Sequence, residues 1–227
     1  MPKQLATIVE VRQETSSVKI FFFKISTPLS FLCGQFVMLT IPGYVDKAGK
    51  GPRRAYSIAS APQDELLELV IKINPAPSLS SELDLLKKGD VVEIDGPYGK
   101  FVFDTKEQNL LFVAGGTGIA PLVSMIRFCQ SQKKNMCLLF GVKTERDIMY
   151  RKELDLLQKK EVLKVVYCLS QEVREGFVAG RVTKILQQEA QNKNDVYVCG
   201  SPGFVKDVVF VLDSVGIAKE HIHKEQW

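Results

Sequence analysis

Residues 110–121 read Leu-Leu-Phe-Val-Ala-Gly-Gly-Thr-Gly-Ile-Ala-Pro, an apolar run that passes through a cluster of glycines to a proline. The apolar run predicts a buried strand, and Pro121 suits the first turn of a helix, where its missing N–H costs little. Glycines let the backbone adopt positive φ and approach a ligand closely. Free N–H groups and the helix dipole there favour a pyrophosphate. The stretch is neither a G-x-G-x-x-G fingerprint nor a Walker A loop. It predicts a nucleotide-binding turn, and a tight strand–helix connection without a ligand is the alternative.

Downstream of this stretch, strand patterns alternate with helix patterns. Strands are predicted at residues 110–114, 136–140, 162–169 and 196–199, and helices at 121–130, 148–159, 181–189 and 203–214. Such alternation is typical of a parallel sheet with helices on both faces. The second half is therefore predicted to be a Rossmann-like α/β domain.

Upstream, the sequence is a series of short β-rich segments separated by turn residues. Strands are predicted at residues 7–12, 18–25, 35–41, 55–59, 66–73 and 91–94, with one short helix at 81–87. This pattern favours a small antiparallel barrel. The pattern changes from β-rich segments to alternating strands and helices at the polar residues 104–108, so we expect two domains, 1–105 and 106–227.

The bulk composition is that of an ordinary globular protein, with 45% hydrophobic and 25% charged residues among 227. Lys and Arg balance Asp and Glu in residues 1–105, at 12 each, and exceed them by 18 to 14 in residues 106–227. This excess is too small to indicate a nucleic-acid partner. No apolar run reaches the roughly 20 residues of a membrane span, and residues 1–6 lack a secretory core, so we expect a cytoplasmic protein.

Metal and cluster sites are not expected. The five cysteines, at positions 33, 129, 137, 168 and 199, contain no CxxC spacing, and the chain has only two histidines. Zinc ribbons and iron–sulfur clusters need closely spaced thiolates. Four of the cysteines are expected to be small buried apolar residues.

Three further segments contain groups suited to ligand binding. Residues 197–203, Tyr-Val-Cys-Gly-Ser-Pro-Gly, follow the last predicted parallel strand, at the edge where open α/β sheets bind ligands. Residues 53–60 alternate a cation, an aromatic ring and a hydroxyl with apolar residues, so that Arg54, Tyr56 and Ile58 share one strand face. Taken alone, this segment is better explained as an exposed edge strand. Ser80 or Ser81 is predicted to cap the short helix or, alternatively, to bind a phosphate.

Together these segments resemble the ferredoxin–NAD(P)H reductase superfamily over nearly the whole chain. The resemblance rests on four motifs in order: residues 54–57 (Arg-Ala-Tyr-Ser), 96–99 (Gly-Pro-Tyr-Gly), 115–121 and 197–202. It implies an antiparallel flavin-binding barrel followed by a parallel-sheet, Rossmann-like nicotinamide-binding domain. It further implies that hydride passes from NAD(P)H to bound FAD and that electrons then pass to a separate acceptor.

The resemblance also implies roles for residues of the first half. Arg54 would pair with a flavin phosphate, Tyr56 would stack on the isoalloxazine ring, and Ser57 would hydrogen-bond near flavin N5. The remaining residues expected to contact the flavin are Ile71, Lys72, Ser80 and Ser81. Residues 75–78, Pro-Ala-Pro-Ser, replace a stretch in which the family usually has glycine, and FAD is still favoured over FMN.

In the second half, the resemblance implies that Gly116, Thr117 and Gly118 cradle the dinucleotide. Cys199 and Gly200 would lie beside the nicotinamide ring. Glu225 matches an acidic residue of the family, and Trp227 would cover the flavin, although a frayed end is the ordinary expectation for a final residue. With Ser57, the residues Cys199, Glu225 and Trp227 make up the expected catalytic group.

The coenzyme and the acceptor stay open between alternatives. Many NADP-using members have Ser-Arg after the third parallel strand, where this chain has Ser170-Gln171, which favours NADH. Lys143 and Arg181 are the remaining candidates for contact with a 2′-phosphate. A separate ferredoxin or flavodoxin is the expected partner. The alternatives are a reductase component of an oxygenase system, a reductase of free flavin, and a nucleotide sensor that lacks the chemistry.

Overall fold

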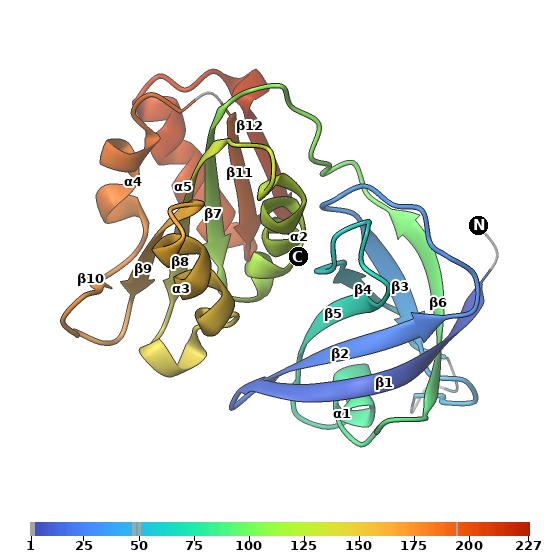
Figure 1. The fold of residues 1–227 in the computed structure, drawn as a ribbon. Coiled ribbons are helices and arrows are strands. Elements are labelled where there is room, and N and C mark those ends of the chain that lie inside the picture. Colours follow the sequence, from blue (N-terminus) through green and yellow to red (C-terminus); the bar gives the residue numbers. More distant parts are fainter. Residues whose placement is uncertain (1–2, 47–48, 50, 194) are drawn as a thin grey trace. The chain divides into compact units, whose positions relative to one another are not determined.

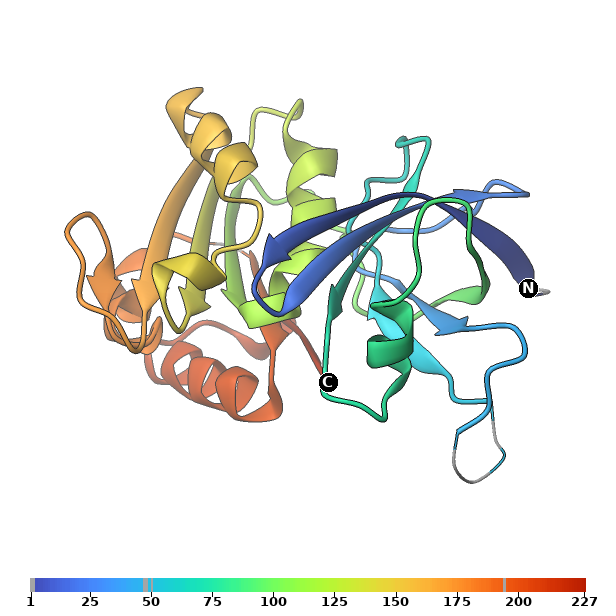
Figure 2. The same ribbon diagram turned by 90° about the horizontal axis from the view of Figure 1, so that it is seen from below.

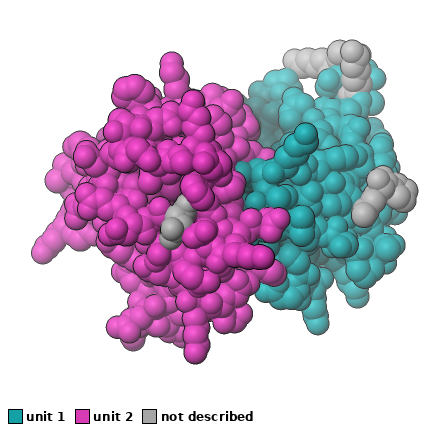
Figure 3. Space-filling view, turned by 90° about the horizontal axis from the view of Figure 1, so that it is seen from above, with its two compact units in different colours: residues 1–103, 123–125 teal, residues 104–122, 126–227 magenta. Residues whose placement is uncertain are grey.

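A computed structural model describes residues 3–46, 49, 51–193 and 195–227 and contains two units (Figure 3). Each unit has its own sheet. Unit 1 comprises residues 1–103 and 123–125, and unit 2 comprises residues 104–122 and 126–227. None of the helices in the described part of the chain has the length and hydrophobicity that crossing a membrane requires.

Unit 1 is built on a six-stranded antiparallel sheet with the order β4-β3-β6-β1-β2-β5. The strands are β1 (Gln4–Thr15), β2 (Val18–Ile25), β3 (Phe36–Thr40), β4 (Arg54–Ser57), β5 (Leu67–Lys72) and β6 (Val91–Tyr98). The two edges of the sheet meet directly after β4, where Ile58 forms an antiparallel bridge with Leu69 and the Ala59 N–H donates to the Glu68 carbonyl at 2.9 Å. The sheet thus closes on itself, and the predicted antiparallel barrel is confirmed.

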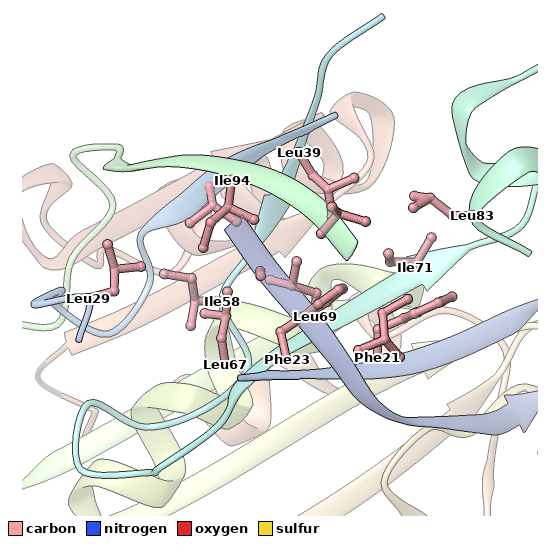
Figure 4. Close-up of a cluster of buried hydrophobic side chains, with 14 of the residues drawn as sticks. Phe21, Phe23, Leu29, Leu39, Ile58, Leu67, Leu69, Ile71, Leu83 and Ile94 are labelled. Atoms are coloured by element: carbon pink, nitrogen blue, oxygen red, sulfur yellow. The ribbon is translucent and has the colours of Figure 1, made fainter. Parts of the chain in front are cut away.

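The core of unit 1 consists of alternate strand residues that point into the closed sheet. Phe21 and Phe23 stack with their ring centroids 6.0 Å apart, and Leu39 and Ile71 are fully buried beside them (Figure 4). Leu83, from the short helix, joins the same cluster. Each such side chain stabilises the fold by about 1.5–3 kcal/mol through its burial.

The short helix α1 spans Leu79–Leu83, which is earlier than the predicted 81–87. Its N-cap is Ser78, so the prediction that Ser80 or Ser81 takes this position was wrong. The Ser78 hydroxyl accepts from the Ser81 N–H at 3.0 Å, and the Ser81 hydroxyl accepts from the Ser78 N–H at 3.0 Å. This reciprocal capping box fixes where the helix begins.

Unit 2 contains a six-stranded parallel sheet with the order β10-β9-β8-β7-β11-β12 (Figure 1). The strands are β7 (Asn109–Gly115), β8 (Asn135–Val142), β9 (Leu163–Leu169), β10 (Val178–Ala179), β11 (Asp195–Gly200) and β12 (Ile222–Gln226). The helices are α2 (Ile119–Cys129), α3 (Arg151–Lys159), α4 (Thr183–Ala190) and α5 (Pro202–Ser214), with 3-10 turns η1 (Gly116–Gly118), η2 (Glu145–Asp147) and η3 (Lys219–His221).

The helices cover both faces of this sheet, with α2 and α3 on one face and α4 and α5 on the other (Figure 2). The predicted α/β architecture is therefore confirmed. The chain starts in β7 and moves outward through β8 and β9, and it later returns to add β11 on the other side of β7. The direction of winding thus reverses between β7 and β11, which is where doubly wound sheets bind their ligands.

Two further differences from the sequence predictions have physical reasons. Helix α3 begins at Arg151 rather than at residue 148, because Tyr150 adopts a left-handed conformation with φ of 58°. The final residues are not frayed, because residues 222–226 form β12 and pair in parallel with β11. Of these five residues only Ile222 is apolar, so the hydrophobic pattern gives no sign of a strand.

Candidate functional site

Two glycine loops lie side by side in unit 2, at the carboxyl ends of β7 and β11. The two strands pair in parallel with Cys199 opposite Ala114, so each strand reaches its glycines at the same edge of the sheet. These loops contain Gly115–Gly118 and Gly200. The structure therefore brings together the two glycine motifs of the sequence at the point where the winding reverses.

The first loop leaves room for an anion. Gly116 has a φ of +55°, and a Cβ at this residue would meet no atom within 4 Å. Helix α2 follows directly, and none of the described side chains caps its first turn. Uncapped N–H groups at the start of a helix suit a phosphate group, so the loop fits the pyrophosphate of a dinucleotide.

Gly118 is required by a close approach between parts of the chain that are distant in the sequence. A Cβ on this residue would overlap the carbonyl group of Cys199 and would lie 2.7 Å from Cη2 of Trp227. The second loop is equally tight, because a Cβ on Gly200 would lie 2.6 Å from the ring of Phe204. Gly118, Cys199, Gly200 and Trp227, all predicted from the sequence, thus form one cluster.

Cys199 is fully buried and lies opposite Glu225 in the ladder between β11 and β12. Burial raises the pKa of the Cys199 thiol well above 9.0, and the neighbouring carboxylate of Glu225 raises it further. The thiol is therefore protonated at neutral pH. A neutral thiol is a small, weakly polar group and a poor nucleophile, so its place suits packing rather than covalent chemistry.

Ser170 and Arg181 lie farther along the sheet and are engaged with other parts of the protein. The Ser170 hydroxyl donates to the Val142 carbonyl at 3.1 Å, which ties the end of β9 to the end of β8. Arg181 pairs with Asp207 at 2.9 Å and is exposed. Neither residue is linked by a described interaction to the glycine loops.

Sequence reasoning missed a charged cluster at the carboxyl ends of β8 and β9. Arg174 lies 2.6 Å from Glu145 and 3.7 Å from Glu172, and the Glu145 N–H donates to the Glu172 carboxylate at 2.8 Å. The only signal in the sequence is that an acidic residue follows each of two neighbouring parallel strands within three residues.

In unit 1, the predicted flavin-binding residues lie on β4. Arg54 is exposed, its guanidinium donates to the Arg53 carbonyl at 2.9 Å, and no carboxylate of the described residues pairs with it. Arg53, by contrast, pairs with Asp95 at 2.5 Å. Tyr56 is half-buried, and burial raises its pKa to about 12, although the charge of Arg54 opposes this. Ser57 is half-buried at the end of the strand.

The bridge between Ile58 and Leu69 brings β4 beside β5, which contains Ile71 and Lys72. Lys72 is exposed, whereas the Ile71 side chain is fully buried in the barrel core. The structure therefore leaves only the backbone of Ile71 available to a ligand. An exposed cation that has no carboxylate partner among the described residues, beside an aromatic ring, suits a flavin with its phosphates, and these residues fit that cofactor.

Ser80 and Ser81 follow β5, and their hydroxyls are engaged in the turn. The buried Ser80 hydroxyl accepts from the Asn74 N–H at 3.0 Å, and the Ser81 hydroxyl belongs to the capping box. The described residues contain no group of three or more His, Cys, Asp or Glu side chains that would hold a metal ion.

Comparison with known proteins gives a consistent result for both halves. The oxidoreductase FAD-binding domain matches residues 5–103, and the oxidoreductase NAD-binding domain matches residues 112–209. Ferredoxin–NADP reductase B of Sorangium cellulosum (strain So ce56) is 30% identical over 239 residues, which cover 98% of this chain and 96% of the relative. The naphthalene 1,2-dioxygenase system ferredoxin–NAD(P)(+) reductase component of Pseudomonas putida is 27% identical over 228 residues, covering 96% of this chain and 67% of that protein.

Solved structures agree on the fold. The ferredoxin NADP+ reductase from Neisseria gonorrhoeae with bound FAD and NADP has a TM-score of 0.86 at 21% identity, over 100% of this chain and 99% of that chain. The chain belongs to the ferredoxin–NADP reductase family, as the four sequence motifs predicted. It is an NAD(P)H-dependent flavin oxidoreductase, with FAD as its cofactor and a nicotinamide dinucleotide as its substrate.

Proposed function

We propose that this protein takes hydride from NADH onto bound FAD and passes the electrons singly to a separate redox protein such as a ferredoxin or a flavodoxin. The observation that carries the proposal is the pair of glycine loops on neighbouring strands of unit 2, in a chain whose β4 supplies the flavin motif of unit 1. Residues 1–105 are assigned to flavin binding and residues 106–227 to nicotinamide binding. The cytoplasmic location expected from the sequence stays a prediction.

The flavin residues are assigned by their position on β4 and β5. Arg54 would pair with a phosphate of FAD, because its guanidinium is exposed and has no carboxylate partner among the described residues. Tyr56 would stack on the flavin ring, and Ser57 would donate a hydrogen bond near N5. FAD supplies the redox chemistry, and the protein supplies orientation and electrostatics. Lys72 and the backbone of residues 71–81, which include Ser80 and Ser81, would complete the contacts.

The nicotinamide residues are assigned from the glycine loops. Gly116, Thr117 and Gly118 would hold the pyrophosphate on the first turn of α2. Cys199 and Gly200 would lie beside the nicotinamide ring. Trp227 contacts the same loop and would control access to it. Glu225 lies opposite Cys199 in the ladder between β11 and β12, next to this position.

NADH is proposed as the coenzyme because two of the cations that follow β9 and β10 already have carboxylate partners. Arg174 is paired with Glu145 and Glu172, and Arg181 is paired with Asp207. A 2′-phosphate would have to compete with these carboxylates, and two acidic groups close by would repel it. The 2′-hydroxyl of the ribose in NADH carries no charge and is not repelled by these carboxylates.

The test is an anaerobic absorbance titration of the purified holoenzyme with NADH and, separately, with NADPH. Loss of the oxidised flavin band at stoichiometric nucleotide supports the hydride step, and the better titrant identifies the coenzyme. Reduced enzyme is then mixed with a ferredoxin, a flavodoxin, or free FMN. Rapid reoxidation by a redox protein supports the proposed partner class, and turnover with free flavin alone would favour the flavin-reductase alternative.

Two arginines give a matched pair for the flavin site. Arg54→Ala should lower retention of FAD by about tenfold or more, because a charge-assisted phosphate contact is lost. Arg53→Ala removes the neighbouring cation, which pairs with Asp95, and should leave FAD binding nearly unchanged. Equal effects of the two substitutions would remove Arg54 from the phosphate site.

A further inference from the structure

One face of β11 and β12 carries two adjacent rows of polar and aromatic side chains. Tyr197 pairs with His223, and Cys199 pairs with Glu225, so these four residues lie on the same face of the sheet. The rings of Tyr197 and His223 stack with centroids 4.5 Å apart and an interplanar angle of 15°. The opposite face of β12 carries Ile222, which packs against the apolar cluster beneath α5.

Asp195 begins the row on β11 and contacts both histidines of the chain. Its carboxylate, almost fully buried, lies 2.8 Å from His221 Nδ1 and 3.4 Å from His223 Nε2. His221 lies in η3 and His223 lies in β12. Asp195 therefore holds the start of β12 through side-chain contacts, in addition to the backbone pairing of β12 with β11.

The ionisable groups around this point favour a charged pair. Burial opposes ionisation of Asp195, but its polar neighbours Thr105, His221 and His223 lower its pKa overall. The hydrogen bond to Asp195 raises the pKa of His221, and Glu220 in η3 and Glu107 before β7 act in the same direction. Helix α5 packs on the opposite face, against Ile222. His223 faces the same Asp195 carboxylate and the ring of Tyr197.

β12 is an edge strand of five residues, paired only with β11. At about 3.3 Å per residue, Trp227 lies roughly 13 Å along the chain from His223. A short edge strand is readily displaced unless side chains anchor it. Whatever fixes the start of β12 therefore also fixes Glu225 opposite Cys199 and Trp227 against Gly118.

We infer that Asp195, His221 and His223 are positioning residues that anchor β12, and that the protonation state of His221 sets how firmly Glu225 and Trp227 are held at the nicotinamide loop. The inference rests on the proposed function for its effect on catalysis. At low pH His221 is charged and holds Asp195 strongly. As pH rises through the pKa of His221, the ion pair becomes a hydrogen bond between a neutral imidazole and the Asp195 carboxylate, and β12 is held less firmly.

Trp227 is the single tryptophan of the chain and reports on this strand without any need for turnover. The test follows its indole N–H resonance in the holoenzyme between about pH 5.5 and 8.5, the range in which histidines titrate. The resonance is expected to shift with pH in the wild type and to lose that shift in the variant His221→Gln/His223→Gln. Lys224→Ala, on the same strand but exposed on the other face, should titrate like the wild type.

Kinetics provide the second readout. The KM for the nicotinamide nucleotide should change by about three- to tenfold across the same titration in the wild type, and this dependence should be absent in Asp195→Asn. The inference is overturned if the indole resonance is independent of pH in the wild type or titrates unchanged in the double variant. If that variant does not fold, His221→Gln alone is used, with the same criteria. If the indole resonance shifts with pH in a protein that does not oxidise NADH, the proposed function is contradicted, but the anchoring of β12 by Asp195, His221 and His223 is supported.

Discussion

The indole ring of Trp227 lies against Gly118, so closely that a Cβ on Gly118 would lie 2.7 Å from Cη2. The same Cβ would overlap the Cys199 carbonyl, which is backbone and cannot move away freely. Gly118→Ala is therefore expected to lower the free energy of unfolding by about 1–3 kcal/mol and to raise the KM for the nicotinamide nucleotide. Urea denaturation and steady-state kinetics measure the two effects.

Gly203 provides the control for this substitution. It lies in the first turn of α5, and a Cβ there would meet no atom within 4 Å. Gly203→Ala should change the stability by less than about 1 kcal/mol, since alanine favours a helix. Equal losses in the two variants would mean that the close approach at Gly118 is not what requires a glycine.

Removing the indole tests the role of Trp227 directly. Trp227 is about half exposed and contacts the loop that would hold the nicotinamide nucleotide. If the ring must move before the nucleotide binds, Trp227→Ala should lower the KM for NADH by roughly threefold, because that conformational cost is removed. Trp227→Phe keeps a ring and should stay near the wild type. An unchanged KM in both variants would argue against a gating role.

Ser57 is expected to act in the hydride step. Its hydroxyl lies at the end of β4, directly after the stretch that contains Arg54 and Tyr56. Ser57→Ala should slow flavin reduction by NADH about 10- to 100-fold, which corresponds to loss of one or two hydrogen bonds in the transition state. Stopped-flow absorbance under anaerobic conditions measures this rate. Ser214→Ala, on the exposed face of α5, is the control and should reduce flavin at the wild-type rate.

Much of the fold could be predicted from local patterns alone. The bounds of β2 were predicted correctly as Val18–Ile25, because that stretch is β-branched and aromatic throughout. β12 was not predicted, because its stability comes from pairing with β11, more than twenty residues earlier in the chain. Ile71 was expected at the cofactor, whereas its side chain lies in the core, since strand alternation decides which face each side chain occupies.

In the candidate site too, the residues that lie in one continuous motif were predicted, and those assembled from distant segments were not. The glycine loops and β4 were found because each is one continuous motif. The cluster of Arg174, Glu145 and Glu172 was not, because it is assembled from loops that follow different strands. The pairing of Asp195 with two histidines was missed for the same reason, since only the register of β12 brings them together.

Buried thiols predict a loss of stability at alkaline pH. Burial raises the pKa of Cys33 from 9.0 to about 11 and the pKa values of Cys137 and Cys168 to about 12. Between pH 9.0 and the raised pKa values, the folded protein therefore keeps thiol protons that the unfolded chain loses. The contribution of the protonated thiols to the free energy of unfolding is complete below pH 9.0 and is lost as pH rises toward 11–12. Each thiol should contribute a slope of about 1.4 kcal/mol per pH unit within that window. Urea denaturation between pH 8 and about 10.5 measures how the free energy of unfolding falls with pH. Cys168→Ala should reduce this slope by the contribution of one thiol.

The paired carboxylates near the ends of β8 and β9 predict the last effect, on the choice of coenzyme. Glu145→Gln/Glu172→Gln removes both partners of Arg174 and two negative charges, while the chain keeps its cation. The KM for NADPH should fall by about three- to fivefold, in line with the strength of partly exposed ion pairs, and the KM for NADH should change little. Glu189→Gln, which removes one negative charge, is the control, because Glu189 pairs with Lys164 at the start of β9, at the opposite edge of the sheet. If the control lowers the KM for NADPH as much as the double variant, the effect reflects net charge and the carboxylates do not select the coenzyme.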